Sequence, residues 1–433
     1  MARLLFISLL MLSIASLSTS QQQCTNSNQV RAGYWLSNSD HYSPLSSINT
    51  SLYTHLYYCS LSVDYSQATI SLPSSDEVPG FMKFSSTLKS TNPSLKTLVT
   101  IFATTQFSSI ASDPNLRKKF IESTIQLART NGFDGVDLSW QFPSSSADMP
   151  NLSELLTEWR SKIDEENQTS LPPLLLTATL YFSNHIFDMP DQNLDYPIEA
   201  LSYNLDWANI LSFSFRKSDN VTFYDAPLYD MSSHYSASYG IMSWLDAGLT
   251  PCKIVMGLPL FGRSWILRNK AKNELGSPIV AAGLKQKMSN HTGLMAYSEI
   301  VNISNDSSVS VSYDNRSVAA YLSSGSTWVS FDSAEVLQEK VMFALQYRLL
   351  GYFLWPISFD DSSYSMSDQA SQVWLKYRNS LTYEDGNIFG FGFGFGQTEA
   401  PSNSPHNTLN RSKASRSTTY HISFLFLLLF LFF

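Results

Sequence analysis

Eight short apolar segments of strand length recur along the chain, and segments with helical spacing of apolar residues lie between them. The strand candidates are residues 31–36, 54–63, 96–102, 133–141, 174–182, 207–215, 253–260 and 351–356. Parallel strands that alternate with helices in this number close into a barrel. The pattern therefore predicts an α/β fold, and specifically a (β/α)8 TIM barrel.

The helix before the fourth strand candidate has clear start and stop signals. Asp113 suits the N-cap, Pro114 suits the first turn, and Gly132 suits a left-handed C-terminal cap. Apolar residues between them recur every three or four positions, which is typical of one buried helix face. We expect a helix over 113–132, and further helices near 333–349 and 367–377.

Charge and the N-terminus indicate an exported protein that does not bind nucleic acid. The net charge is −8 and the pI is near 5.4, whereas a nucleic-acid footprint needs a basic face. Arg3 precedes an apolar run from Leu4 to Ile14, and small residues lead to Gln21. This predicts a signal peptide over residues 1–20, since the run is too short to span a membrane. Many Asn-x-Ser/Thr triplets also favour a secreted, extracellular glycoprotein.

The cysteines are three, so at least one thiol is free or intermolecular. Cys59 lies in an apolar run and is interpreted as a core residue, while a bridge between Cys24 and Cys252 stays open. No spacing of Cys and His residues suggests a metal site, and we expect neither a metal nor a cofactor.

The C-terminal part of the chain lacks the composition of a folded core. Residues 381–421 are polar and Ser-rich around a Phe-Gly repeat, which predicts a low-complexity linker. Residues 422–433 form an apolar tail. A polar spacer before a short apolar end has the outline of a glycolipid-anchor signal, so membrane attachment through a processed tail is one interpretation. A truncated transmembrane helix is the alternative.

The fourth strand candidate carries the most informative residues. Gly132 to Pro143 reads Gly-Phe-Asp-Gly-Val-Asp-Leu-Ser-Trp-Gln-Phe-Pro, in which Asp137, Ser139 and Gln141 alternate with apolar residues. Period-2 alternation places these three side chains on one strand face. In a parallel barrel such a face points inward, and its last residue reaches the C-terminal mouth, where active sites lie.

This segment resembles the family 18 glycoside hydrolases, the chitinase group, which carry Asp-Gly-x-Asp-x-Asp-x-Glu at this place. Asp134 and Asp137 match the first two family aspartates, but Ser139 replaces the third and Gln141 replaces the catalytic Glu. The resemblance covers a barrel domain over 27–380, is closest to the plant class V chitinases, and extends to the ectodomain of plant chitinase-related receptor kinases. It implies a small α+β insertion, about 266–328, between the seventh strand and seventh helix. A long glycosylated loop is the alternative.

The resemblance implies a reaction for which no catalytic residue is intact. Family members cleave β-1,4 links between N-acetylglucosamine units, with a Glu as proton donor and the substrate acetamide as nucleophile. Gln141 has no proton to transfer at neutral pH, and Ser139 has no charge. At the end of its sixth strand the family has a Met-x-Tyr-Asp motif, which binds the acetamide. In this chain Phe213 replaces the Tyr and Ser214 replaces the Asp. On the third strand, Phe102 puts a large ring at the mouth.

Three aromatic residues match family positions that contact sugar. Tyr34 lies in the first strand, Trp265 ends the family's Gly-x-Pro-x-Tyr-Gly-x-x-Trp motif, and Trp355 ends the last strand as the floor under the sugar. Aromatic faces give sugar rings apolar contact. We therefore expect Trp355, Tyr34 and Trp265 to bind substrate, with plain core tryptophans as the alternative for Trp355 and Trp265.

These residues favour a secreted, non-hydrolytic chitinase-like protein. Its expected partner is a chitin-type oligosaccharide or another protein, in a role such as cell-surface recognition. One alternative is a residual chitinase that uses another carboxylate, for which Asp360 and Asp361 follow the last strand. The other is an inactive storage or inhibitor scaffold, which the ring of Phe102 favours.

Overall fold

A computed structural model describes residues 29–166, 172–187, 189, 194–215, 220–307 and 309–381 of the chain. The predicted signal peptide, the linker beyond residue 381, the apolar tail and Cys24 lie outside the described residues. Within them, Cys59 is a free and buried thiol, whereas Cys252 is disulfide-bonded. None of the helices in the described ranges combines the length and the apolar character that crossing a membrane requires.

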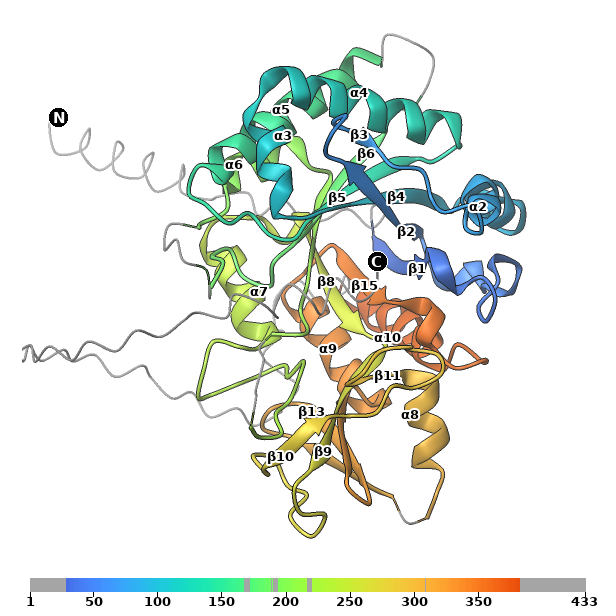
Figure 1. The fold of residues 1–433 in the computed structure, drawn as a ribbon, viewed down its shortest axis with the longest axis vertical. Coiled ribbons are helices and arrows are strands. Elements are labelled where there is room, and N and C mark those ends of the chain that lie inside the picture. Colours follow the sequence, from blue (N-terminus) through green and yellow to red (C-terminus); the bar gives the residue numbers. More distant parts are fainter. Residues whose placement is uncertain are drawn as a thin grey trace, which may run out of the picture.

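A closed barrel of eight parallel strands forms the centre of the molecule (Figure 1). Its strands are β1 (Val30–Leu36), β2 (His55–Asp64), β4 (Lys96–Ala103), β5 (Gly135–Trp140), β6 (Leu175–Leu180), β7 (Trp207–Ile210), β8 (Ile254–Pro259) and β15 (Gly351–Trp355). They pair in chain order, and β15 pairs with β1 to close the barrel. This confirms the predicted (β/α)8 fold, since each strand candidate corresponds to one barrel strand. The short β3 (Thr69–Ile70) extends β2 on one side.

Helices surround the barrel. They are α2 (Val78–Thr91), α3 (Ser108–Ser112), α4 (Pro114–Thr130), α5 (Asp148–Glu166), α6 (Ile198–Asn204), α7 (Ala237–Asp246), α9 (Ala334–Gln346) and α10 (Ser365–Leu381). The start and stop signals of α4 act as predicted. Asp113 accepts hydrogen bonds from the backbone N–H groups of Asn115 and Leu116 at 2.8 and 3.1 Å, and Gly132 has φ +70°. The chain therefore turns directly from α4 into β5.

A second sheet of six strands lies between β8 and α9, where the α+β insertion was predicted (Figure 1). Its elements are β9 (Phe261–Leu267), β10 (Ile279–Ala282), β11 (Leu294–Ala296), α8 (Tyr297–Ser304), β12 (Ser310–Asp314), β13 (Ala319–Ser324) and β14 (Thr327–Phe331). The sheet is thus wider in sequence than the expected 266–328. The reason is that the chain leaves the barrel at Leu260, so that β9 already belongs to the insertion.

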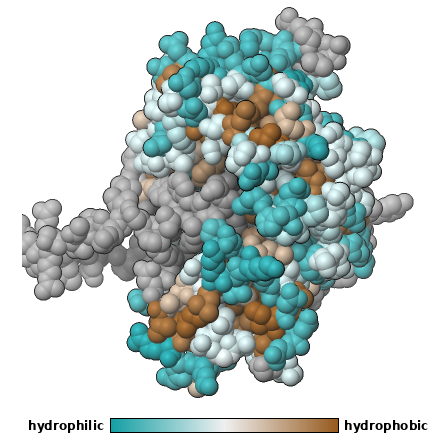
Figure 2. Space-filling view, turned by 45° about the vertical axis from the view of Figure 1, so that its right-hand side comes forward, coloured by the Kyte–Doolittle hydropathy of each residue, from teal (hydrophilic) through white to brown (hydrophobic). Residues whose placement is uncertain are grey.

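The insertion has its own small core. Trp265, Trp328, Phe223 and neighbouring apolar side chains form a buried cluster separate from the main core. In the view of Figure 2, patches of apolar residues lie on the lower part of the molecule, with hydrophilic surface around them. The main core fills the barrel and the layer between its strands and helices, and it continues into the insertion through Ile300, Leu322 and Val329. The insertion therefore packs partly on the main core and partly around its own cluster.

Candidate functional site

β5 positions the predicted site residues along one line that runs toward the C-terminal end of the barrel. Asp137 lies opposite Thr100 of β4 and Thr177 of β6, and Ser139 lies opposite Phe102 of β4. All three polar side chains of the strand segment are buried, with exposed fractions of 0% for Asp137, 2% for Ser139 and 4% for Gln141. The inward face expected from the alternation is therefore present.

Asp137 is the centre of a hydrogen-bond network inside the barrel. It accepts hydrogen bonds from the hydroxyls of Thr177 (2.7 Å), Thr179 (2.8 Å), Thr100 (3.2 Å) and Tyr34 (3.3 Å) and from the side-chain amide of Asn209 (3.3 Å). Burial raises the pKa of the Asp137 carboxyl, and the hydrogen bonds from Thr177 and Thr179 oppose that rise. Every one of these partners is uncharged. Asp137 therefore acts as the acceptor that holds the barrel interior together.

Gln141 and Ser139 contact each other at the end of this line. The amide nitrogen Nε2 of Gln141 donates to Oγ of Ser139 over 3.0 Å, and the backbone N–H of Gln141 donates to the carbonyl of Ala103 over 2.8 Å. The other amide atom, Oε1, is buried and has no hydrogen-bond partner among the described residues. An amide and a hydroxyl can donate and accept hydrogen bonds, but neither supplies a proton at neutral pH.

Phe213 and Ser214 follow β7 at the same end of the barrel. The Phe213 ring packs edge-on against Phe261, with centroids 5.7 Å apart, and is 4% exposed. Gly257 on β8 leaves the space for it, since a Cβ there would lie 2.8 Å from the Phe213 ring. Ser214 has a left-handed backbone, with φ +55°, and its hydroxyl donates to Asp225 over 3.3 Å. A phenyl ring and a hydroxyl therefore occupy this side of the mouth.

The three aromatic residues predicted to bind sugar lie in different places. Tyr34 is completely buried in the barrel, where it stacks on Tyr57 at 4.3 Å and joins the Asp137 network. Trp355 ends β15, 5.0 Å from the Tyr34 ring, and is 3% exposed. Trp265 packs between Phe223 and other apolar side chains of the insertion core. The structure brings Tyr34 and Trp355 together and leaves Trp265 apart from them.

Asp134 lies at the opposite end of β5 from Gln141. It forms ion pairs with Lys89 at 2.6 Å and Lys96 at 3.4 Å, and it accepts the backbone N–H of Thr97 at 2.8 Å. Burial acts to raise its pKa, but the hydrogen bonds and the two lysines outweigh it, so the pKa lies below its usual value. Asp134 therefore fixes the N-terminal end of the barrel.

Asp360 and Asp361 have structural partners. Asp360 accepts hydrogen bonds from the backbone N–H groups of Met366 and Ser367 and from the Ser367 hydroxyl. Asp361 accepts from Ser363 and Ser365. Both carboxylates thus satisfy orphan donors where α10 begins. This geometry assigns them to helix capping and gives no support to a role as replacement acids.

Sequence reasoning did not identify the partners of Asp137. Thr177 and Thr179 alternate along β6, so their period-2 spacing on an otherwise apolar strand was the available signal. Asn209 on β7 donates both to Asp137 and to the Tyr34 hydroxyl, at 3.3 and 2.8 Å. Within the described ranges, no group of three or more His, Cys, Asp or Glu side chains is placed to hold a metal ion.

The chain is similar to known proteins along nearly all of its described length. Residues 30–360 match the family described as glycosyl hydrolases family 18. Nod factor hydrolase protein 1 of Medicago truncatula is 38% identical over 360 residues, which are 81% of this chain and 91% of that protein.

Two solved structures are similar to the chain as well. One is a mutant class V chitinase from Nicotiana tobaccum in complex with an N-acetylglucosamine tetramer, with 35% identity and a TM-score of 0.74. The other is the chitinase-like agglutinin from Robinia pseudoacacia, with 34% identity and a TM-score of 0.71. Each match covers 80% of this chain and 99% of the other.

Proposed function

The chain belongs to glycosyl hydrolase family 18, and from that premise we propose that it is a non-hydrolytic chitinase-like protein that binds chitin-type oligosaccharides. The observation that carries the proposal is the contact between Gln141 and Ser139 at the end of β5. These residues stand where the resemblance places a proton-donating Glu and a charge-stabilising Asp.

Loss of the proton donor alone removes a large part of the expected rate. Proton transfer by a positioned acid contributes roughly 10²–10⁴ in rate, which equals about 3–5 kcal/mol of barrier. An amide cannot supply that contribution. Asp137 is no substitute, because its carboxyl is saturated with hydrogen bonds inside the barrel. Phe213 and Ser214 stand where the resemblance implies a tyrosine hydroxyl and an aspartate carboxylate, so both of these groups are missing from the mouth. The same site is therefore expected to be inactive for several independent reasons.

Binding does not need the missing proton. The Oε1 atom of Gln141 is a buried acceptor without a partner among the described residues, and a sugar hydroxyl or acetamido N–H can donate to it. Trp355 ends β15 at the same end of the barrel, and its ring lies 5.0 Å from the Tyr34 ring. The similar Nicotiana chitinase is a glutamate-to-glutamine mutant that was crystallised with a tetrasaccharide, and the similar Robinia protein is an agglutinin. Both neighbours support a binding role for a barrel of this kind.

A second candidate function is that of an inactive scaffold, for storage or inhibition. It is favoured by the burial of the mouth, where Phe102, Gln141 and Trp355 are 4%, 4% and 3% exposed. Such a protein would bind a protein partner and no sugar.

Isothermal titration with the N-acetylglucosamine tetramer separates the two candidates. We expect binding with a Kd below about 1 mM, equivalent to roughly 4 kcal/mol. Binding should be lost in Trp355→Ala and kept in Trp159→Ala, a matched change at a tryptophan of α5 that is also buried, with exposed fractions of 3% and 0%. Absence of heat at millimolar tetramer would reject the sugar-binding function and leave the scaffold.

We also propose export of the protein, on the basis of its N-terminal apolar run and its sequons. Mass spectrometry of the protein from its native tissue tests this. A mature N-terminus at Gln21 supports export, whereas a retained Met1 contradicts it.

A further inference from the structure

The seam between the barrel and the insertion contains four charged side chains that are almost completely buried. Arg263 lies on β9, Asp225 on the segment after β7, Asp332 directly after β14, and Lys340 on α9. Their exposed fractions are 7%, 4%, 3% and 0%. Removing such groups from water is costly unless each has a partner of opposite charge. The stability of the seam therefore depends on how these four charges are paired.

The first pair joins the insertion to the mouth of the barrel. Nε of Arg263 donates to Oδ1 of Asp225 over 3.4 Å, and Oγ of Ser214 donates to Oδ2 of Asp225 over 3.3 Å. Nη2 of Arg263 also donates to Oγ of Ser214 over 3.4 Å. Because Ser214 follows β7 and Arg263 belongs to the insertion, this triangle connects the two parts directly.

The second pair meets the first at the same segment. Nζ of Lys340 lies 2.5 Å from Oδ2 of Asp332 and donates to the carbonyl of Ala226 over 2.6 Å. Burial raises the pKa of Asp332 and lowers the pKa of Lys340, and the attraction between the two charges opposes both shifts. Asp225 and Ala226 are adjacent in the chain, so one short segment contacts both Arg263 of the first pair and Lys340 of the second.

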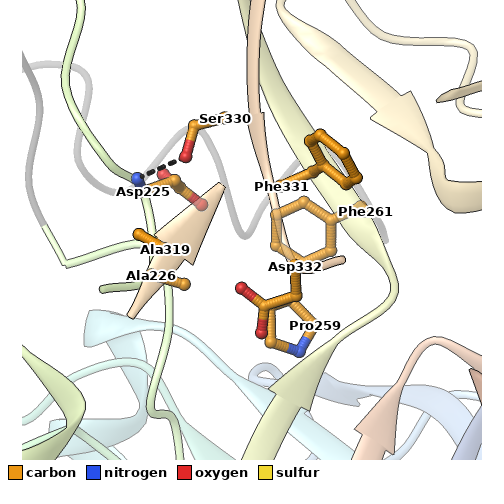
Figure 3. Close-up of a pocket in the computed structure, with 8 residues that line it drawn as sticks. All are labelled: Asp225, Ala226, Pro259, Phe261, Ala319, Ser330, Phe331 and Asp332. Carbon is orange, nitrogen blue, oxygen red and sulfur yellow. Dashed lines mark hydrogen bonds between the residues drawn. The ribbon is translucent and has the colours of Figure 1, made fainter. Parts of the chain in front are cut away.

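A cavity of about 10 Å³ lies between the pairs, enough for about one water molecule. It is lined by Asp225, Ala226, Pro259, Phe261, Ala319, Ser330, Phe331 and Asp332. Figure 3 shows Asp225 beside Ser330, to which its backbone N–H donates over 3.1 Å, and the Asp332 carboxylate below the ring of Phe261. Phe261 also packs on Phe213 at the mouth. One carboxylate of each pair therefore lines the same cavity as Phe261, the residue with which the insertion reaches the mouth.

We propose that Asp225 and Arg263 are positioning residues that fix the insertion as a wall of the sugar-binding mouth and thereby set the affinity for long oligosaccharides. Phe261 of the insertion packs on Phe213 at the mouth. We infer from this that the insertion contacts the outer units of a long oligosaccharide, so that its position matters for a tetramer more than for a dimer. This inference rests on the sugar-binding function proposed above.

Asp225→Asn is the direct test, because it keeps the shape of the side chain and leaves the Arg263 charge buried without its carboxylate. Titration should give a tetramer affinity about tenfold weaker than that of the unaltered protein and an N-acetylglucosamine dimer affinity changed less than twofold. Hydrogen exchange should become at least tenfold faster in β9 and β14 and stay unchanged in β1. Glu274→Gln, which removes the same charge from an exposed position of the insertion, should change none of these.

A double variant, Asp225→Leu with Arg263→Met, replaces the pair by apolar side chains and protects the test against a failure to fold. We expect it to regain both slow exchange and tetramer affinity. Unchanged tetramer affinity in Asp225→Asn despite faster exchange would overturn the proposal, and so would equal losses for dimer and tetramer. Low affinity in the double variant with exchange restored would also overturn it, since Asp225 would then contact sugar itself. If the unaltered protein binds neither the dimer nor the tetramer, the proposed function fails, and the positioning of a sugar-binding mouth fails with it. The exchange rates then report only whether the Asp225–Arg263 pair fixes the insertion.

Discussion

The Asp137 network offers the sharpest test of how this barrel is stabilised. Asp137→Ala removes both acceptor oxygens of the carboxylate. The Thr177 hydroxyl then loses its partner at 2.7 Å, and the Thr179 hydroxyl loses its contact at 2.8 Å and keeps only the Tyr34 hydroxyl. Each hydrogen bond to a charged group contributes about 1.5–3 kcal/mol, and each orphaned buried donor costs about 1–3 kcal/mol. Release of a buried carboxylate offsets part of this loss. We expect a net loss of roughly 3 kcal/mol in the free energy of unfolding.

Thermal unfolding followed by circular dichroism measures this loss. A domain of this size has an unfolding entropy of roughly 0.7 kcal/mol/K, so the Tm should fall by about 4 °C. Asp137→Asn keeps one acceptor oxygen and should lose less than half as much.

The matched control is Asp134→Ala on the same strand segment. Asp134 is partly exposed and paired with Lys89, so its removal should cost only about 1 kcal/mol. A Tm of Asp137→Ala that equals the unaltered protein, or a larger loss in Asp134→Ala, would refute the assigned role of the network.

Further predictions concern pH, buried charge and packing. Burial raises the pKa of Asp360 to about 6, above its unfolded value of about 3.9, so its contribution to stability is full below about pH 4 and is lost as pH rises to about 6. The unfolding free energy in urea should therefore fall by up to ~3 kcal/mol in total between pH 4 and 6.5, and Asp360→Asn should remove this fall. The same pH dependence in Asp360→Asn contradicts the prediction. Lys340→Met leaves Asp332 buried without its cation and should lower the unfolding free energy by about 3–5 kcal/mol in urea melts. Adding Asp332→Asn to this variant should restore most of the loss. A Lys340→Met protein as stable as the unaltered one would contradict the prediction. Gly257→Ala places a Cβ 2.6 Å from the Phe353 ring and should lower Tm by several degrees. Gly80→Ala, whose Cβ has its nearest neighbour 3.7 Å away, should leave Tm unchanged. Equal Tm values for the two variants would refute the packing argument.

The barrel could be predicted because its strands and helices have strong local patterns. Eight apolar segments at regular spacing identify the strands, and Asp113 with Gly132 marks both ends of α4. These signals depend on neighbours in sequence, so no tertiary contact was needed to interpret them. The insertion boundary was less accurate because Phe261 to Leu267 has the same apolar character as the end of β8. Only the pairing of β9 with β14 distinguishes the two.

The candidate site was predictable in its residues and less so in their surroundings. The alternation along β5 correctly placed Asp137, Ser139 and Gln141 on one buried face. The partners of Asp137 come from β4, β6 and β7 and from Tyr34 on β1, and their convergence depends on barrel closure. The Asp225–Arg263 pair joins residues 38 positions apart across the seam, and no local pattern indicates it.

Product release from the N-acetylglucosamine tetramer, followed by mass spectrometry over many hours, tests whether the residues at the end of β5 still cleave sugar. We expect the unaltered protein to release no more product than its Gln141→Ala variant, because neither side chain can donate a proton. Release by the unaltered protein that Gln141→Ala abolishes would refute the non-hydrolytic function, since it would show that this site still performs the reaction.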